Sequence, residues 1–408
     1  MNHTAIFGPL VSEAYSVRLH SFSALDSYMG LAPLPFTLVE TNAGIPVLAR
    51  LLEGLRFPGP DIADGAADAD GQSWYFHCVD PEDVETRRPS YSLLSLTQNL
   101  NTRCFRDPLD TYPLLRKLRD RRRPSPHSQD TPADPWWTGL YPGADRYRAL
   151  MDAALILARY GKHNDSVTGR NSSPPLTEIL RSQANLSDSP KPKPEARRLL
   201  LTGLLVSPCP DLGLELLKAA GFIRELWPEL AILDDVDHSK EYHPEGNVWK
   251  HTLETLRYRK TAANNKTAYD LRLSLGLLLH DMGKPLAAPS GSRRFDGHAE
   301  LGARAAGKFL ERLEFDPPFI EDIYYLVKNH MLPAALPRLP LSRTREILES
   351  PLFPTLLELY RCDESSSFKG LDGYYKSSAA YQSYLRNRRN PYRSADGKKM
   401  GKRSARGY

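Results

Sequence analysis

The sequence predicts an α+β protein, with a small mixed α/β domain at the N-terminus followed by an all-helical domain. The chain has 408 residues, of which 41% are hydrophobic and 25% charged, which is typical of a globular protein of two or three domains. Short apolar runs between Gly, Pro and Asp residues characterise roughly its first 120 residues. Apolar residues at three- and four-residue spacing characterise the rest and predict helices.

The N-terminal domain is predicted to contain a small mixed sheet. Residues 36–39 and 74–79 are apolar runs bounded by turn-forming residues and are its candidate strands. We assign residues 1–118 to this domain. Residues 119–143 carry an arginine cluster and then a Pro-, Ser- and Asp-rich stretch, which favours a loop or a domain boundary.

Helical periodicity recurs through the remainder of the chain, with polar connectors that contain Pro, Gly or Asp. The predicted helices are residues 147–160, 195–205, 212–220, 269–280, 299–313, 319–329 and 353–362. Residues 144–235 are expected to form a helical neck with a flexible insertion at 161–194. Residues 236–385 are expected to form the main helical domain.

Positive charge is concentrated at the C-terminus. The net charge is +5, but residues 386–408 contain nine Lys or Arg and one Asp, a net of +8. A segment with so little to bury is predicted to be a disordered tail. It serves either as a solubilising tail or as a nonspecific RNA contact, because clustered Lys and Arg displace counterions from phosphates.

The cellular compartment is predicted from what the sequence lacks. No apolar run approaches the roughly 18 residues that a membrane helix needs, so no membrane association is expected. The N-terminus has neither a basic leader nor a long apolar stretch, which favours a cytoplasmic protein. The scattered cysteines at 78, 104, 209 and 362 fit reduced thiols better than a disulfide framework or a thiolate zinc site.

The stretch LSLGLLLHDMGKP, residues 273–285, carries the strongest chemical signal. An apolar helix runs directly into His280 and Asp281, and an ionised Asp at a buried helix end needs a compensating partner. A metal is the natural partner, and nitrogen plus oxygen ligands suit divalent Mn, Fe, Ni, Co, Mg or Zn. The helix is predicted to stop at Gly283. Lys284 is then expected on a turn beside the metal, where it can hold a phosphate oxygen.

Further candidate ligands occur at other helix ends. His251 is predicted in the first turns of a helix that begins near Asn247, and His298 at the start of another. His330 closes a helix, and Asp363 lies near the end of the last one. Each alone is readily explained as a capping or surface residue. All of them in this order favour a helical bundle that points its ligands at one centre.

The pattern resembles a known family. The order His251, His280-Asp281, His298, His330 and Asp363 is similar to that of HD domain metal-dependent phosphohydrolases. The stretches HPEGNVWKHTL, LLLHDMGKP, FDGHAELGA and LVKNHM resemble the HD portion of bacterial tRNA nucleotidyltransferases and poly(A) polymerases, over about residues 144–363. Residues 144–161 are similar to the helix that follows the polymerase head in that family.

The resemblance implies roles for individual residues. One divalent ion would be held by His251, His280, Asp281 and Asp363. His298 and His330 would serve a second ion, so one or two ions are expected. Asp281 and Lys284 would be the catalytic residues, with Lys284 facing phosphate. His243 has a structural or substrate-side role.

A nucleotidyltransferase head needs a Gly-rich turn and an Asp-x-Asp pair that holds magnesium. Here only Gly44 stands in the turn position, and Glu40 and Thr41 stand where the glycines would begin. Asp68 and Asp70 form an Asp-x-Asp, which we expect in a solvated loop rather than on a strand. The resemblance therefore implies a degenerate head.

The predicted function is a metal-dependent phosphohydrolase of the HD type that acts on a nucleotide or RNA phosphate ester. The resemblance suggests 2',3'-cyclic phosphodiesters, 2'-nucleotides or phosphomonoesters as substrates. One alternative is an RNA 3'-end nucleotidyltransferase, which requires Asp68 and Asp70, or Asp61 and Asp64, to converge. A second is a noncatalytic RNA-binding protein that uses the basic tail and the arginines at 119–123.

Overall fold

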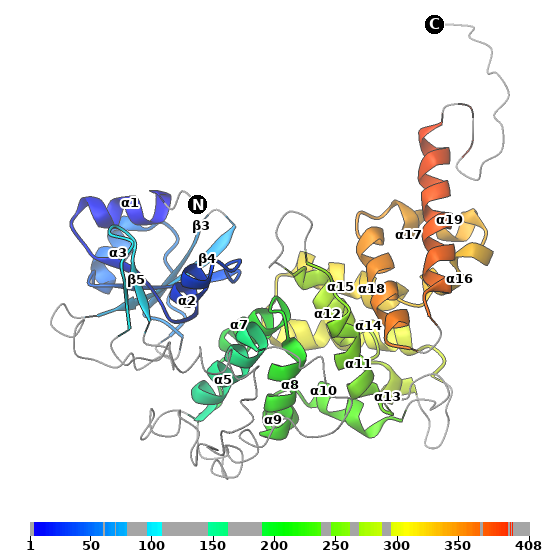
Figure 1. Cartoon of the computed structure of the whole chain (residues 1–408), viewed down its shortest axis with the longest axis horizontal. Coiled ribbons are helices and arrows are strands. Elements are labelled where there is room, and N and C mark those ends of the chain that lie inside the picture. Colours follow the sequence, from blue (N-terminus) through cyan, green and yellow to red (C-terminus); the bar gives the residue numbers. More distant parts are fainter. Residues whose placement is uncertain are drawn as a thin grey trace, which may run out of the picture. The chain divides into compact units, whose positions relative to one another are not determined.

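The chain forms two compact units. The computed structural model describes residues 4–59, 62–69, 71–79, 96–107, 146–161, 190–237, 246–261, 269–287, 295–367, 370–390, 392 and 394. Unit 1 comprises Met1–Ile223 and Thr261–Tyr269, and unit 2 comprises Arg224–Lys260 and Asp270–Tyr408 (Figure 1). Asp61, Asp70, His243, the arginine cluster at 119–123 and most of the segment 161–194 lie outside the described residues.

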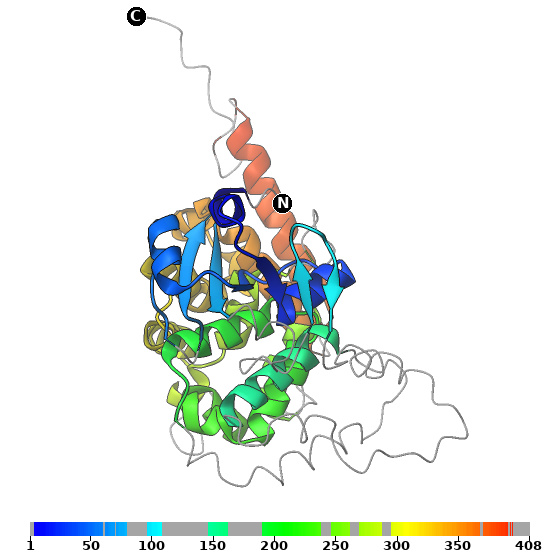
Figure 2. The ribbon, with the colours of Figure 1, turned by 90° about the vertical axis from the view of Figure 1, so that its left-hand side faces the viewer.

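Unit 1 contains the expected mixed sheet. Its strands are β1 (Val17–His20), β2 (Phe36–Thr41), β3 (Gly65–Ala69), β4 (Gln72–Cys78), β5 (Thr97–Asn99) and β6 (Phe105–Arg106). They lie in the order β3-β4-β2-β1-β5-β6, and only the β2–β4 pair is parallel among these strands (Figure 2). Both predicted strands are confirmed, as β2 and β4. The expectation of a loop at Asp68 is wrong, because this residue lies on β3 and pairs with Ser73 of β4.

Three short helices cover the sheet of unit 1 and were missed by the sequence analysis. They are α1 (Thr4–Ser12), α2 (Ser21–Met29) and α3 (Ile45–Leu51). Each is seven to nine residues long, and α1 contains Pro9, so the helical period had too few turns to be visible. Phe7 of α1 packs edge-on against Trp74 of β4, inside one buried apolar cluster.

A buried ion pair joins the first neck helix to this domain. The helices α5 (Arg146–Tyr160), α7 (Pro194–Leu205) and α8 (Pro210–Ala219) confirm the helices predicted there and pack on one another. Arg159 Nε donates to Asp26 Oδ1 at 2.5 Å, and both side chains are buried. Tyr160 donates its hydroxyl hydrogen to the same carboxylate oxygen. Two donors at one acceptor offset part of the cost of burying this carboxylate, and burial still raises the pKa of Asp26.

Unit 2 is helical, as predicted. Its elements are α9 (Phe222–Leu226), which begins in unit 1, α10 (Pro228–Ala231), the 3-10 turn η2 (Ile232–Asp235), α11 (Val248–Arg257), α12 (Leu271–Leu279), α13 (Lys284–Ala287), α14 (His298–Arg312), α15 (Pro317–Asn329), α16 (Leu332–Ala335), the 3-10 turn η3 (Leu336–Arg338), α17 (Leu341–Glu349), α18 (Phe353–Ser365) and α19 (Asp372–Arg389). The buried helix α12 packs against α11, α15 and α18. Every residue from 273 to 279 is buried, which places most of α12 in the core of unit 2.

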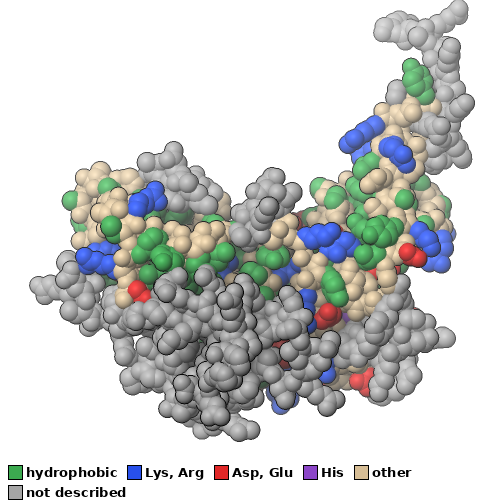
Figure 3. Space-filling view, viewed as in Figure 1, with side chains coloured by type: hydrophobic (Ala, Val, Ile, Leu, Met, Phe, Trp, Pro, Cys, Tyr) green, Lys and Arg blue, Asp and Glu red, His purple; other side chains and the backbone are tan. Residues whose placement is uncertain are grey.

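The helix α19 extends four residues into the segment that was expected to be a disordered tail. Its last turn contains Arg386, Arg388 and Arg389. Arginine is a good helix former, and a positive charge is favourable near the C-terminal end of a helix. Lys and Arg side chains gather near this end (Figure 3). Neither α19 nor any other described helix is long and apolar enough to cross a membrane.

A pair of buried histidines lies on the sheet of unit 1. His20 Nε2 of β1 and His77 Nδ1 of β4 are 2.9 Å apart. Burial lowers the pKa of both imidazoles, and the charges of His77 and Arg148 lower that of His20 further. The pKa of His77 falls to about 3 from an ordinary 6.5. Both rings are therefore neutral at physiological pH.

We expect this pair to make unit 1 sensitive to acid. Below pH 6.5 these histidines bind protons in the unfolded chain but stay neutral in the folded one. Their contribution to stability is therefore fully present above pH 6.5 and is lost as the pH falls toward the folded-state pKa of His77, about 3. Scanning calorimetry of the full chain between pH 7.5 and 4.5 should show the melting temperature falling with pH. His77→Gln should flatten this dependence, and an unchanged slope in that variant would refute the assignment.

Candidate metal centre

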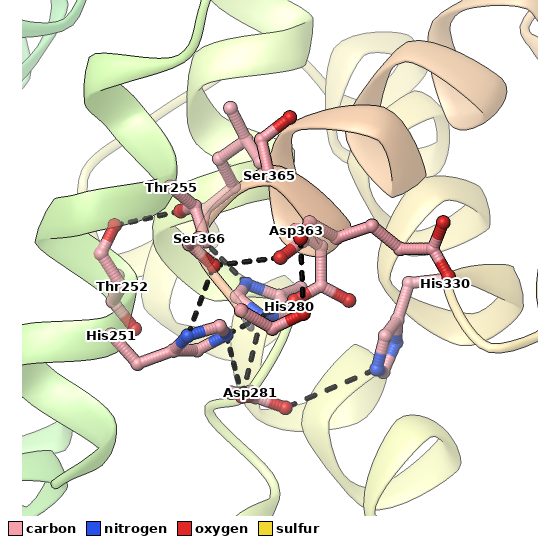
Figure 4. Close-up of polar contacts among 12 residues, drawn as sticks. His251, Thr252, Thr255, His280, Asp281, His330, Asp363, Ser365 and Ser366 are labelled. Atoms are coloured by element: carbon pink, nitrogen blue, oxygen red, sulfur yellow. Dashed lines mark hydrogen bonds and ion pairs between the residues drawn. The ribbon is translucent and has the colours of Figure 1, made fainter. Parts of the chain in front are cut away.

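The candidate ligands converge from separate helix ends in unit 2 (Figure 4). His251 lies in the first turn of α11, and His280 and Asp281 form the turn that follows α12. The remaining ligands are His298 at the start of α14, His330 at the C-cap of α15 and Asp363 in the last turn of α18. The prediction that these residues lie at helix ends agrees with the structure, but Asp363 is on α18, and α19 follows it.

Local sequence fixes where these helices begin and end. Asn247 caps α11 by accepting the backbone N–H of Lys250, and Asp270 caps α12 by accepting that of Leu273. After Leu279 the chain turns, and α13 begins at Lys284. The expectation of Lys284 on a turn is therefore wrong: it is the first residue of a short helix, and its backbone N–H reaches the carbonyl of Asp281.

Two glycines let α14 approach this turn closely. A Cβ at Gly283 would lie 1.9 Å from the carbonyl oxygen of His298, and one at Gly302 would lie 2.9 Å from the backbone N of Gly283. Neither separation is possible between real atoms without movement of the backbone. Glycine at both positions therefore allows α14 to bring His298 beside Asp281.

One oxygen of Asp281 faces a first group of ligand atoms. Its Oδ2 lies 3.2 Å from His280 Nε2 and 3.9 Å from His251 Nε2. Asp363 Oδ1 completes the group, at 3.0 Å from His251 Nε2 and 4.0 Å from His280 Nε2. Two imidazole nitrogens and two carboxylates thus surround one point.

The other oxygen of Asp281 faces a second group. Its Oδ1 lies 3.6 Å from His298 Nε2 and 3.9 Å from His330 Nε2, and these two nitrogens are 3.1 Å apart. Asp281 is the member that the two groups share. Its carboxylate therefore bridges them through different oxygens.

Hydrogen bonds on the far side of the rings set the tautomers. The Nδ1 atoms of His280, His298 and His330 each lie 2.7 Å from the carbonyl oxygen three residues earlier. A carbonyl can only accept, so each Nδ1 carries the hydrogen. Nε2 of each ring is thereby left to face the centre, where it can offer a lone pair to an ion, an orientation typical of histidines that bind metals.

This arrangement of donor atoms fits a bound cation. The lone pairs of His298 and His330 face each other, and the buried Nε2 of His280 has no hydrogen-bond partner among the described residues. Burial lowers the pKa of His330 to about 4 and lowers that of His298, so both stay neutral. Neutral imidazoles and ionised carboxylates are the donor set that divalent transition metals accept.

The carboxylates are ionised despite their burial. Burial alone would raise the pKa of Asp281, but His280 and Lys284 outweigh it and hold the pKa well below its ordinary value. Burial likewise opposes ionisation of Asp363, and the hydrogen bond from His251 lowers its pKa below the ordinary range. Lys284 Nζ lies 2.6 Å from Asp281 Oδ2 and 5.6 Å from the centre of the Phe295 ring, so an ammonium group stands at the edge of the centre.

Sequence reasoning missed the residues that support these ligands. Ser366 and the carbonyl of Phe295 contact ligand histidines on the side away from the centre, and Gly302 meets the turn after α12. A serine three residues after Asp363 and a glycine four residues after His298 were visible in the sequence. Only the packing of distant segments gives them a role.

Unit 1 contains no comparable carboxylate cluster within the described residues. Asp64 Oδ2 accepts the backbone N–H of Cys78 at 2.8 Å, and Asp68 Oδ1 accepts the hydroxyl hydrogen of Ser73 at 2.6 Å. Both aspartates are thus engaged within the β3–β4 hairpin. The groups of described residues that could hold a metal ion both lie in unit 2.

Comparison with known proteins confirms the resemblance of unit 2. Residues 248–355 match the HD domain family. The multifunctional CCA protein of Halorhodospira halophila (strain DSM 244 / SL1) is 36% identical over 128 residues, which cover 31% of this chain and 29% of that protein. The bifunctional uridylyltransferase/uridylyl-removing enzyme of Mycobacterium tuberculosis (strain ATCC 25618 / H37Rv) is 32% identical over 174 residues, or 42% of this chain and 20% of that enzyme.

The matched segments thus span less than a third of the length of these two relatives. A crystal structure of the Bacillus stearothermophilus CCA-adding enzyme in complex with CTP aligns with 94% of this chain and 81% of its own, at 11% identity and a TM-score of 0.48.

The two interior glycines of α14 provide a test of the close approach. Gly302→Ala should lower the free energy of unfolding by about 1–3 kcal/mol, because the added methyl group displaces the turn at Gly283. Gly307→Ala is the matched control, since its Cβ would meet only Ile320 at 3.9 Å, and it should gain up to about 1 kcal/mol from helix propensity. Urea unfolding measures the free energy of unfolding of both variants, and equal changes in Gly302→Ala and Gly307→Ala would contradict the close approach at Gly283.

Proposed function

We propose that this chain, whose residues 248–355 are an HD domain, is a metal-dependent phosphohydrolase that acts on a nucleotide or RNA phosphate ester. The observation that carries the proposal is the convergence of histidine Nε2 lone pairs on both oxygens of one buried carboxylate. Such a set has no structural need to be buried, because apolar residues would fill the same volume at lower cost.

The residues divide into two binding groups. His251, His280, Asp281 and Asp363 would hold one divalent ion, and Asp281, His298 and His330 would hold a second. An ion bound there lowers the pKa of water toward neutrality and so supplies a nucleophile for phosphorus.

The chain itself contributes orientation and charge. The backbone carbonyls that accept from the histidines keep their Nε2 atoms aimed at the centre before any substrate arrives. Lys284, with a side chain 13% exposed, stands where its ammonium group can bind a nonbridging phosphate oxygen. There it would offset the negative charge that develops on phosphorus-bound oxygens in the transition state.

The relatives support the same class of chemistry. The name of the mycobacterial enzyme includes uridylyl removal, which is the hydrolysis of a nucleotidyl phosphodiester. A third relative, 35% identical over 135 residues, is named a CC-adding tRNA nucleotidyltransferase, a name that includes both tRNA and nucleotide transfer. A phosphate ester at an RNA end or on a nucleotide suits both. The basic end of α19 and the segment that follows it favour a contact with RNA.

Metal content tests the proposal without a choice of substrate. The purified chain should contain about one or two equivalents of a transition metal by plasma mass spectrometry, after reconstitution with Mn, Fe, Ni or Co if needed. Asp281→Asn should lose most of it, because the shared carboxylate belongs to both groups. Asp322→Asn is the matched control, since Asp322 forms a surface ion pair with Arg272.

The same samples are then assayed for hydrolysis of phosphate esters, including 2',3'-cyclic nucleotides, 2'-nucleotides and phosphomonoesters. Hydrolysis by wild type and the Asp322→Asn control, with a loss of at least about 100-fold in Asp281→Asn, is the expected result. Absence of bound metal in the reconstituted wild type would overturn the proposed function.

A pocket in unit 1 favours a second candidate function, nucleotide binding by the degenerate head. Apolar and aromatic side chains line it together with Arg148, Asp152, Lys191 and the His20–His77 pair. A planar base fits the apolar wall, and the two cations suit a phosphate group. This candidate retains the nucleotidyltransferase relation while leaving the hydrolysis to unit 2.

Calorimetric titration with nucleoside triphosphates tests this second candidate. Arg148→Ala should weaken binding at least about tenfold. Arg198→Ala, which removes a cation near Glu195 of α7 rather than one in the pocket, should bind as wild type does. Wild type that takes up no nucleotide, or equal binding by both variants, would exclude the candidate.

A further inference from the structure

His251 differs from the other ligand histidines in how its ring is held. The other three donate Nδ1–H to a backbone carbonyl three residues earlier. His251 Nδ1 instead lies 3.3 Å from the hydroxyl oxygen of Ser366, on a different helix. We propose that Ser366 is the positioning residue of the metal centre, which sets the tautomer and orientation of His251. This inference rests on the proposed function.

The need for Ser366 follows from where His251 sits. The last four carbonyls of a helix lack partners within it, and His280 and His330 take theirs from the last turns of α12 and α15. The carbonyl that serves His298 precedes α14. His251 is in the first turn of α11, where the carbonyls are used by the next turn of the helix. An acceptor for its Nδ1–H therefore has to come from another element.

The hydrogen bonds of Ser366 determine the direction of this contact. Ser366 is the C-cap of α18 and is 8% exposed. It donates its hydroxyl hydrogen to the carbonyl oxygen of Asp363 at 2.7 Å. A hydroxyl has one hydrogen, so toward His251 the oxygen accepts and Nδ1 is the donor. With the hydrogen held on Nδ1, Nε2 can donate to Asp363 Oδ1, 3.0 Å away, or give up that hydrogen and turn its lone pair to a bound ion.

Ser366 thus connects two ligands of the same ion. It bonds the backbone of Asp363 and the ring of His251, so the end of α18 and the start of α11 are held in one geometry. Without the hydroxyl, Nδ1–H loses this acceptor, which favours the tautomer that carries the hydrogen on Nε2 and has no lone pair there for the ion. The second group, made by Asp281, His298 and His330, does not include His251 and should keep its affinity.

Cobalt titration of the full chain tests the inference, because visible d–d bands report binding and ligand geometry directly. Ser366→Ala should bind one equivalent of Co²⁺ about 10–100-fold more weakly and shift its bands, as the loss of a partner behind a ligand histidine does. The other equivalent should be unchanged. Ser365→Ala is the matched control, since Ser365 donates to the carbonyl of Arg361 on its own helix.

An isosteric pair separates the hydroxyl from the packing. Ser366→Thr should retain the wild-type affinity, and Ser366→Val, which has the same shape without the hydroxyl, should lose it. If both variants bind Co²⁺ alike, or if Ser366→Ala binds as the Ser365→Ala control does, the role of Ser366 is refuted while the proposed function stands. Wild type that binds no Co²⁺ would overturn both.

Discussion

The carboxylate of Asp281 is the group on which the candidate centre depends. It is ionised and buried at the end of an apolar helix, and each of its oxygens faces a separate set of histidines. Burying such a charge costs several kcal/mol unless partners surround it. Those partners are Lys284 at the start of α13, His280 after α12, and the histidines at the ends of α11, α14 and α15. The packing of unit 2 therefore does two things: it buries the leucines of α12 and it surrounds the charge of Asp281 with partners.

Stability and function are coupled at this centre. The Nε2 atoms of His298 and His330 lie 3.1 Å apart with their lone pairs facing each other, which is unfavourable without a cation between them. Binding energy supplied by a metal would therefore add to the folding free energy of unit 2. The close contact between Gly283 and Gly302 does not depend on a metal, because it involves backbone atoms alone. Packing brings the candidate ligands together, and a bound cation would relieve the repulsion between their lone pairs.

The sequence was informative where one segment carries the signal. The run of leucines that ends in His280-Asp281 predicted both a buried helix and a ligand pair, and the long periodic helices were found within a few residues. Contacts between distant segments were out of reach: nothing near Ser366 in the sequence indicates that it meets His251. The strand that carries Asp68 was missed because alanine, glycine and aspartate are weak strand formers, and pairing with β4 decides their conformation.

Anomalous X-ray diffraction from crystals of the reconstituted protein, recorded at the absorption edge of the bound metal, tests the central claim most directly. The account predicts peaks on either side of the Asp281 carboxylate, one near the Nε2 atoms of His251 and His280 and the other near those of His298 and His330. A single peak next to Asp281 Oδ2 would limit the centre to one ion. Anomalous density elsewhere in the chain, with none at Asp281, would contradict the account.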